Sequence, residues 1–330
     1  MDLNVVWFIL IAVLFTGFFI LEGFDYGVGM LLIGRSENER TQLIRAIGPV
    51  WDANEVWMIT AGGASFAAFP HFYASMFSTF YMALFLMLLA LIMRGVAFEL
   101  RGKIDNRDWR LFWDSAIIFG SVVPALLWGV AMANLLRGLP IDSQMHYAGN
   151  FFNLLSPYTL VAGIFFVLLF AFHGATFLSL RLADERLILD LRRKAKYLGA
   201  AAWLAYLAFT IGTAVETDVM EHTSGVLIFA SAMGVLSAGW EFARDGKQRS
   251  SFTTTTVTIA MTTLGLFVAL FPRLMVSSLN PEWSLTIYNA ASTPNTLFIM
   301  TIAAVIMVPV VLIYQGWTYK IFKERVAPIK

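Results

Sequence analysis

Long runs of apolar residues recur along the whole chain and constrain its fold more than any other feature. Each run is about 20 residues long, enough for a helix to cross a hydrocarbon core of roughly 30 Å. Helices satisfy their own backbone hydrogen bonds, as lipid requires. The composition agrees, because 58% of the 330 residues are hydrophobic and only 14% are charged, against about 25% charged in soluble proteins. The sequence therefore predicts an all-α, polytopic membrane protein with bundle packing.

Nine transmembrane helices are expected. They lie near residues 5–33, 51–70, 71–100, 111–137, 156–182, 195–216, 222–243, 252–274 and 295–319. The connections are short, and residues 1–330 are expected to form a single integral membrane domain. A tight turn is predicted at Pro70 and His71, where the second and third helices meet.

The basic residues give the orientation, because Lys and Arg in short loops mark the cytoplasmic side. In the nine-helix arrangement 20 of the 23 basic residues fall on one side, in loop 34–50, in loop 101–110, between 181 and 196, between 244 and 249, and in the C-terminal tail. The other loops are acidic or polar. The N-terminus is therefore expected outside and the C-terminus in the cytoplasm.

Several classes of function are disfavoured by composition. A net charge of +1 gives no reason to expect nucleic acid as a partner. The chain has no cysteine, which excludes disulfides and thiolate-ligated metal centres. Of its four histidines only His173 is expected inside the bundle, so a bis-histidine haem lacks a second ligand there. We expect His173 to be a hydrogen-bonded core residue, and no metal site is predicted.

Five ionisable side chains of the first three expected helices stand out, because a charge at the centre of a membrane helix costs at least about 2.5–3.5 kcal/mol. They are Glu22 and Asp25 in the first helix, Asp52 and Glu55 in the second, and Arg94 in the third. Counted from the cytoplasmic helix ends, Arg94, Asp25 and Glu22 lie roughly 9–16 Å deep. Asp52 and Glu55 lie at the cytoplasmic start of the second helix, so all five fall in the inner leaflet. We expect one cluster in which Arg94 is the countercharge and the carboxyl groups take up and release protons.

Two purely structural interpretations of the same residues stay open. Asp52 followed by Glu55 resembles a capping box, with Asp52 as the N-cap of the second helix. An ion pair of Arg94 with Glu22 or Asp25 could simply hold the bundle together. Glycines at 23, 27 and 29 surround the acids of the first helix and would let another backbone approach closely.

Buried acids in a many-helix chain fit two classes of function. An ion-coupled secondary transporter is one, although transporters usually place their sites near the midplane on interrupted helices. The other is a subunit of a membrane redox complex that supplies scaffold and proton access while a partner holds the cofactors. The position of the acids in one leaflet slightly favours the second.

Three segments resemble subunit II of the cytochrome bd quinol oxidases. They are "GFDYGVGML" at 23–31, "GPVWDANEVWMITAGGASFAAFP" at 48–70 and "RGVAFELRGK" at 94–103. The length, helix number and outward N-terminus are similar to that family over essentially the whole chain. The resemblance implies a prokaryotic cell membrane and a terminal oxidase of the respiratory chain that uses quinol and oxygen.

The resemblance also implies partners and site residues. Subunit I of the family carries two b-type haems and one d-type haem, and subunit II is its haem-free, pseudo-symmetric partner. Asp52 matches the Asp that the family assigns to a cytoplasmic proton path at the subunit interface, and Asp25 and Arg94 match residues near it. Glu22 and Glu55 are expected to be its polar neighbours. A small accessory subunit and a structural quinone occur in the family, and no residue here is assigned to either.

Overall fold

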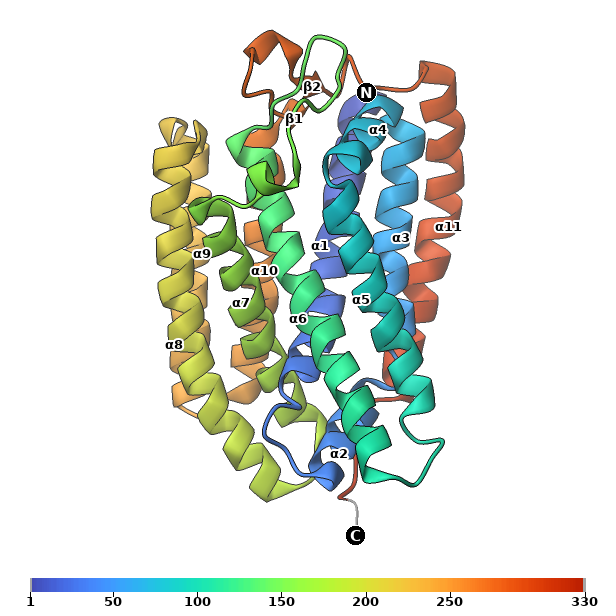
Figure 1. The fold of residues 1–330 in the computed structure, drawn as a ribbon, viewed down its shortest axis with the longest axis vertical. Coiled ribbons are helices and arrows are strands. Elements are labelled where there is room, and N and C mark those ends of the chain that lie inside the picture. Colours follow the sequence, from blue (N-terminus) through green and yellow to red (C-terminus); the bar gives the residue numbers. More distant parts are fainter. Residues whose placement is uncertain (1, 329–330) are drawn as a thin grey trace.

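The helices pack side by side along one axis, as Figure 1 shows. The computed structural model describes residues 2–328. Its helices are α1 (Leu3–Met30), α2 (Glu37–Ile47), α3 (Trp51–Ala68), α4 (Pro70–Thr79), α5 (Tyr81–Leu100), α6 (Arg107–Arg137), α7 (Pro157–Arg181), α8 (Glu185–Glu216), α9 (Thr223–Arg244), α10 (Gln248–Leu270) and α11 (Pro294–Ile321). The start of α1 and the end of α11 lie at opposite ends of the bundle (Figure 1).

The predicted all-α membrane architecture is confirmed. Eight helices within residues 2–328 are long and apolar enough to cross a membrane: α1, α5, α6, α7, α8, α9, α10 and α11. The expected second helix, α3, is not among them because Asp52, Asn54 and Glu55 make its first turns polar. It nevertheless packs against α1 and α11 inside the bundle and runs beside α5 (Figure 1).

Several boundaries differ from the sequence-based expectation. The turn before Pro70 is present, but the third helix is interrupted at Phe80 and forms α4 and α5. Loop 34–50 contains α2, which Ser36 and Glu39 start with a capping box. The sixth expected helix begins ten residues earlier, at Glu185, because the Asp184 carboxylate caps it by accepting from the Leu187 amide. Charged residues 185–194 therefore extend α8 instead of forming a loop.

The two ends of the bundle differ in structure. One end, here the α2 end, carries α2, the α5–α6 loop and the α7–α8 connection (Figure 1). The opposite end carries two short antiparallel strands, β1 (Arg273–Met275) and β2 (Leu285–Thr286), with Arg273 paired to Thr286. The prediction that helix continues to residue 274 was wrong, because Pro272 cannot donate an amide hydrogen bond to extend α10. We call this end the β end.

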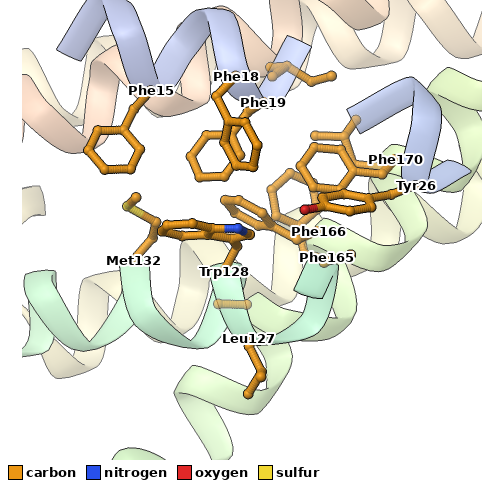
Figure 2. Packing of buried hydrophobic residues seen from close by; sticks show 14 of the residues in the cluster. Phe15, Phe18, Phe19, Tyr26, Leu127, Trp128, Met132, Phe165, Phe166 and Phe170 are labelled. Carbon is orange, nitrogen blue, oxygen red and sulfur yellow. The ribbon is translucent and has the colours of Figure 1, made fainter. Parts of the chain in front are cut away.

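Aromatic side chains fill the centre of the bundle around α1. Phe15, Phe18 and Phe19 of α1 project toward Trp128 of α6, and Figure 2 shows this face-to-edge packing. Their ring centroids lie 5.5–5.8 Å from that of Trp128. Such offset aromatic pairs each add about 0.5–1.5 kcal/mol beyond the area they bury. The core therefore holds α1 firmly against α6, and Phe166 and Phe170 extend it to α7.

A glycine contact brings α1 and α7 together below this core. A Cβ atom at Gly27 would lie 2.0 Å from the Phe170 carbonyl oxygen and 2.9 Å from the Gly174 backbone. A Cβ at Gly174 would in turn meet the Gly27 backbone at 2.6–2.7 Å. The expected close backbone approach is confirmed, and it fixes the part of α1 that carries Glu22 and Asp25.

Candidate functional site

Arg94 is the centre of a buried ion-pair group formed by α1, α3 and α5. Its Nη1 donates to Glu22 Oε1 and lies 3.7 Å from Glu55 Oε1. Glu22 and Arg94 have no exposed surface, and the Glu55 side chain is 25% exposed. Three helices are thereby joined through one guanidinium. The prediction that Arg94 is the countercharge of Glu22 and Glu55 is consistent with this geometry.

Asp25 joins the group through an asparagine that was not singled out from the sequence. Asn54 of α3 donates its Nδ2 to Asp25 Oδ2 at 2.7 Å. The hydroxyl of Tyr319, in the last turn of α11, donates to Asn54 Oδ1 at 2.8 Å. Asp25 and Asn54 are both fully buried. The polar layer therefore reaches from α5 through α1 and α3 to α11.

The group contains more carboxyl groups than cations. Glu22, Asp25 and Glu55 face one guanidinium, whose other side lies over the Tyr26 ring at 4.8 Å and the Phe98 ring at 5.6 Å. Several buried polar atoms of the group have no hydrogen-bond partner among residues 2–328: Glu22 Oε2, Asp25 Oδ1, Tyr26 Oη, Glu55 Oε1, Arg94 Nε and Arg94 Nη2. Most buried polar groups in proteins are paired. This group therefore has free donors and acceptors as well as surplus carboxyl groups, which are the features that proton binding needs.

Asp52 lies apart from the other four residues. It is exposed on α3 and forms no salt bridge within residues 2–328. The expectation that it is the N-cap of the second helix was wrong, because α3 already begins at Trp51, after Val50, and has no side-chain cap. Asp52 is instead in the first turn, where a carboxylate is favoured by the helix dipole. Glu55 points to Arg94 and does not reach back to complete a capping box.

Sequence reasoning missed a second buried charge cluster nearer the α2 end. Asp114 of α6 is 2% exposed and accepts from Arg101 Nε at 2.5 Å and from Arg40 Nη1 at 3.0 Å. Arg101 also donates to the Thr41 hydroxyl at 3.0 Å. A charge four residues inside the expected helix 111–137 was the available signal. Tyr319 could have been found because it lies four residues after Gln315, so that two polar side chains share one face of an apolar helix.

His173 is the hydrogen-bonded core residue that its position suggested. It is fully buried on α7 and stacks on Phe252 at 4.7 Å. Its Nδ1 lies 2.7 Å from the Thr255 hydroxyl and its Nε2 lies 3.2 Å from the Ile20 carbonyl oxygen. Both ring nitrogens are therefore engaged by the protein. The remaining histidines, His71, His146 and His222, are exposed.

Curated relatives are similar over nearly the whole chain. A Bacillus subtilis protein named cytochrome bd ubiquinol oxidase subunit 2 is 41% identical over 99% of this chain and 97% of its own length. An Escherichia coli K12 protein named cytochrome bd-I ubiquinol oxidase subunit 2 is 37% identical over 96% of this chain and 93% of its own length. A Haemophilus influenzae protein named probable cytochrome oxidase subunit 2 is 36% identical over the same shares.

A solved structure and a family model agree with these relatives. A chain of the bd oxidase from Geobacillus thermodenitrificans has a TM-score of 0.73 with this chain at 16% identity, covering 98% of this chain and 99% of that one, and so supports the fold. The model of cytochrome bd terminal oxidase subunit II matches residues 3–322. The chain therefore belongs to the cytochrome bd terminal oxidase subunit II family.

Proposed function

We propose that this chain is the haem-free subunit of a bacterial bd-type quinol oxidase and supplies protons from the cytoplasm for the reduction of oxygen to water. Its partner is subunit I, whose haems pass electrons from quinol to oxygen. The observation that carries the proton role is the buried group of Glu22, Asp25 and Glu55 around Arg94. Up to two of these carboxyl groups lack a cation, and protons can neutralise them.

The donor chemistry of the chain supports a haem-free role. Haem iron needs an axial ligand such as a His nitrogen with a free lone pair. His173 uses both nitrogens in contacts with Thr255 and Ile20. No cluster of three or more potential metal ligands occurs among residues 2–328. We therefore place the two b-type haems and the d-type haem, and with them the redox steps, in subunit I.

The orientation follows from the charged ends of the bundle. The basic connections gather at the α2 end, which we assign to the cytoplasm by the positive-inside rule. The N-terminus is then outside and the C-terminus is inside, in a bacterial cell membrane. Glu22, Asp25, Glu55 and Arg94 fall in the cytoplasmic half. Asp52, exposed on α3 near the same end, is placed to receive protons before they reach the buried group.

Exposed apolar surface supports a membrane partner for the α3 and α11 side. Within the described chain Leu297 is the one buried residue of α11. Ile59 of α3 is 66% exposed, and Val305 and Ile313 of α11 are 69% and 74% exposed. Such surface is stable against lipid or against another membrane subunit. We assign it to both, with subunit I covering the region around Asp52; the accessory subunit and the structural quinone receive no residues.

The proton role is tested with Asp52→Asn and Asp25→Asn in the assembled oxidase in vesicles. We expect quinol-driven oxygen consumption and proton uptake to fall at least about tenfold, equivalent to 1.4 kcal/mol in the rate-limiting barrier, while haem content stays normal. Asp105→Asn is the matched control, because Asp105 is an acid at the same end whose side chain is 96% exposed. Unchanged proton uptake in both variants would contradict the proton role.

A second experiment separates the oxidase subunit from the transporter. The chain expressed alone should show no haem absorbance, and a haem-bearing subunit of similar helix number should copurify with it from native membranes. A stoichiometric haem spectrum from the isolated chain would contradict the haem-free assignment. Ion-driven solute uptake by the isolated chain in liposomes would favour the secondary transporter.

A further inference from the structure

Asn54 has hydrogen-bond partners on two other helices. Its Nδ2 donates to Asp25 on α1 at 2.7 Å, and its Oδ1 accepts from the Tyr319 hydroxyl on α11 at 2.8 Å. A longer contact of 3.5 Å joins Oδ1 to Gln315 Nε2 on the same helix. The Asn54 side chain is fully buried, so bulk water cannot supply a hydrogen-bond partner to its oxygen or its nitrogen. Its orientation is set by these protein groups.

Tyr319 is the nearest donor to the oxygen of this amide, at 2.8 Å against 3.5 Å for Gln315 Nε2. A carboxamide has an acceptor oxygen and a donor nitrogen of nearly equal shape, so either could be directed toward a carboxyl group. The phenol of Tyr319 donates to the oxygen and thereby holds it toward α11. The NH2 group is then directed toward Asp25 Oδ2, and Asp25 Oδ1 is left without a partner. Oδ1 is the oxygen that remains free to bind a proton.

We propose that Tyr319 is a positioning residue of the proton path, which orients Asn54 and through it the proton-binding carboxyl of Asp25. This inference rests on the proposed function of the acidic group. Tyr319 does not itself need to carry the proton. Its role is to keep one oxygen of Asp25 occupied by a donor and the other open, so that each proton binds at the same place.

The alternative is that Tyr319 only ties α11 to the bundle. A second tie of this kind is present, because Trp57 Nε1 of α3 donates to Gln315 Oε1 at 2.8 Å. Gln315 lies one helical turn from Tyr319 and contacts Asn54 Oδ1 only at 3.5 Å. Replacing Gln315 therefore weakens the attachment of α11 while the strong Tyr319–Asn54–Asp25 series remains. The two variants separate orientation from attachment.

The experiment compares Tyr319→Phe, Gln315→Leu and Asp25→Asn in the assembled oxidase in vesicles. Tyr319→Phe keeps the ring and removes only the hydroxyl. We expect it to lower turnover and proton uptake by about 2- to 12-fold, the rate equivalent of one hydrogen bond, with the quinol KM unchanged. Tyr314→Phe is the control, because Tyr314 lies on the same helix with 62% of its surface exposed.

Infrared spectroscopy distinguishes the two roles, because a purely structural contact of Tyr319 would not shift the carboxyl C=O band of Asp25. The carboxyl C=O band that disappears in Asp25→Asn should shift in Tyr319→Phe and keep its position in Gln315→Leu. All bands and rates are taken per haem of assembled complex, so reduced assembly does not obscure them. Equal slowing of Tyr319→Phe and Gln315→Leu, or an unshifted Asp25 band in Tyr319→Phe, would overturn the positioning role. Normal proton uptake in both Asp25→Asn and Asp52→Asn would instead overturn the proposed function.

Discussion

Arg94 lies on α5 and Arg101 is the C-cap residue of the same helix, and each belongs to a different buried charge cluster. Arg94 faces three carboxyl groups, with unpaired oxygens on Glu22 and Asp25. Arg101 shares one carboxylate, Asp114, with a second guanidinium from Arg40. The first cluster has surplus acid, and the second has surplus cation.

This difference separates a group that can change its proton number from one that cannot. Both oxygens of Asp114 accept from arginines, which are charged at every physiological pH. Protonation of Asp114 would break bonds to two cations at once. In the Arg94 cluster a proton can bind a carboxyl group that no cation neutralises. We infer that the Asp114 cluster stabilises the junction of α2, α5 and α6. The surplus carboxyl groups of the Arg94 cluster stabilise the fold less and allow protons to bind and leave.

Neutralising one acid in each cluster is the most direct test of this difference. Asp114→Asn leaves the buried Arg101 and the partly buried Arg40 without this counterion, and breaking a buried pair costs about 3–5 kcal/mol. Glu22→Gln removes one of three carboxyl groups and leaves Glu55 beside Arg94 as a countercharge, so we expect a smaller loss of stability. The thermal inactivation midpoint of the purified complex measures both. Turnover per assembled complex should be preserved in Asp114→Asn and reduced in Glu22→Gln.

The outcome that contradicts this division is a reversal of order. If Glu22→Gln destabilised the complex as strongly as Asp114→Asn, Glu22 would be a structural ion pair and the surplus of acid would have no consequence. The exposed pair of Glu241 and Arg244, 2.7 Å apart on α9, provides a control. Glu241→Gln should change stability by no more than about 1 kcal/mol.

Close backbone packing between α1 and α7, and not charge pairing, holds the acidic segment of α1 in position. Gly27→Ala would place a methyl group 2.0 Å from the Phe170 carbonyl oxygen, and backbone cannot yield as a flexible side chain does. We expect a loss of about 1–3 kcal/mol, the usual effect of overpacking, with Asp25 displaced and turnover reduced. Gly234→Ala in α9 is the matched control, because nothing lies within 4 Å of its added Cβ. There the change should be neutral or stabilising by about 0.5–1 kcal/mol.

A smaller loss in Gly27→Ala than in Gly234→Ala would contradict the packing argument. Thermal inactivation of the two purified complexes decides this, and proton uptake then shows whether displacement of α1 reaches Asp25.

Sequence reasoning predicted the membrane bundle and the shared layer of charges because both depend on regular spacing. Apolar runs define the helices, and counting from their ends brings Glu22 and Arg94 to one depth. It could not predict contacts that depend on how helices rotate about their axes. Asn54, two residues from Asp52, points inward while Asp52 points outward. Asp114 was missed because one of its partners, Arg40, lies in α2, a helix that the pattern did not reveal.

The ion pair at the β end extends the comparison to partly exposed charges. Arg273 donates to both oxygens of Asp218, at 2.8 and 3.2 Å. These hydrogen bonds lower the pKa of the Asp218 carboxyl below its usual value, against the opposing effect of partial burial. The Asp218 side chain is 40% exposed, so solvent screening limits the pair to a few tenths of a kcal/mol, within the roughly 0–1 kcal/mol of surface pairs.

The sign of its pH dependence follows from this lowered pKa. The unfolded carboxyl titrates near pH 4, so the stabilisation is complete above that pH and is lost as the pH falls through the lower pKa of the folded state. Asp218→Asn should therefore lower the thermal midpoint at pH 7 by about a degree, and the difference should shrink as the pH falls below about 4. High salt should also shrink the effect, since exposed charges are screened. A difference that grew toward acid pH would mean that the Asp218 carboxyl is stabilised in its protonated form, as a buried acid without a cation would be.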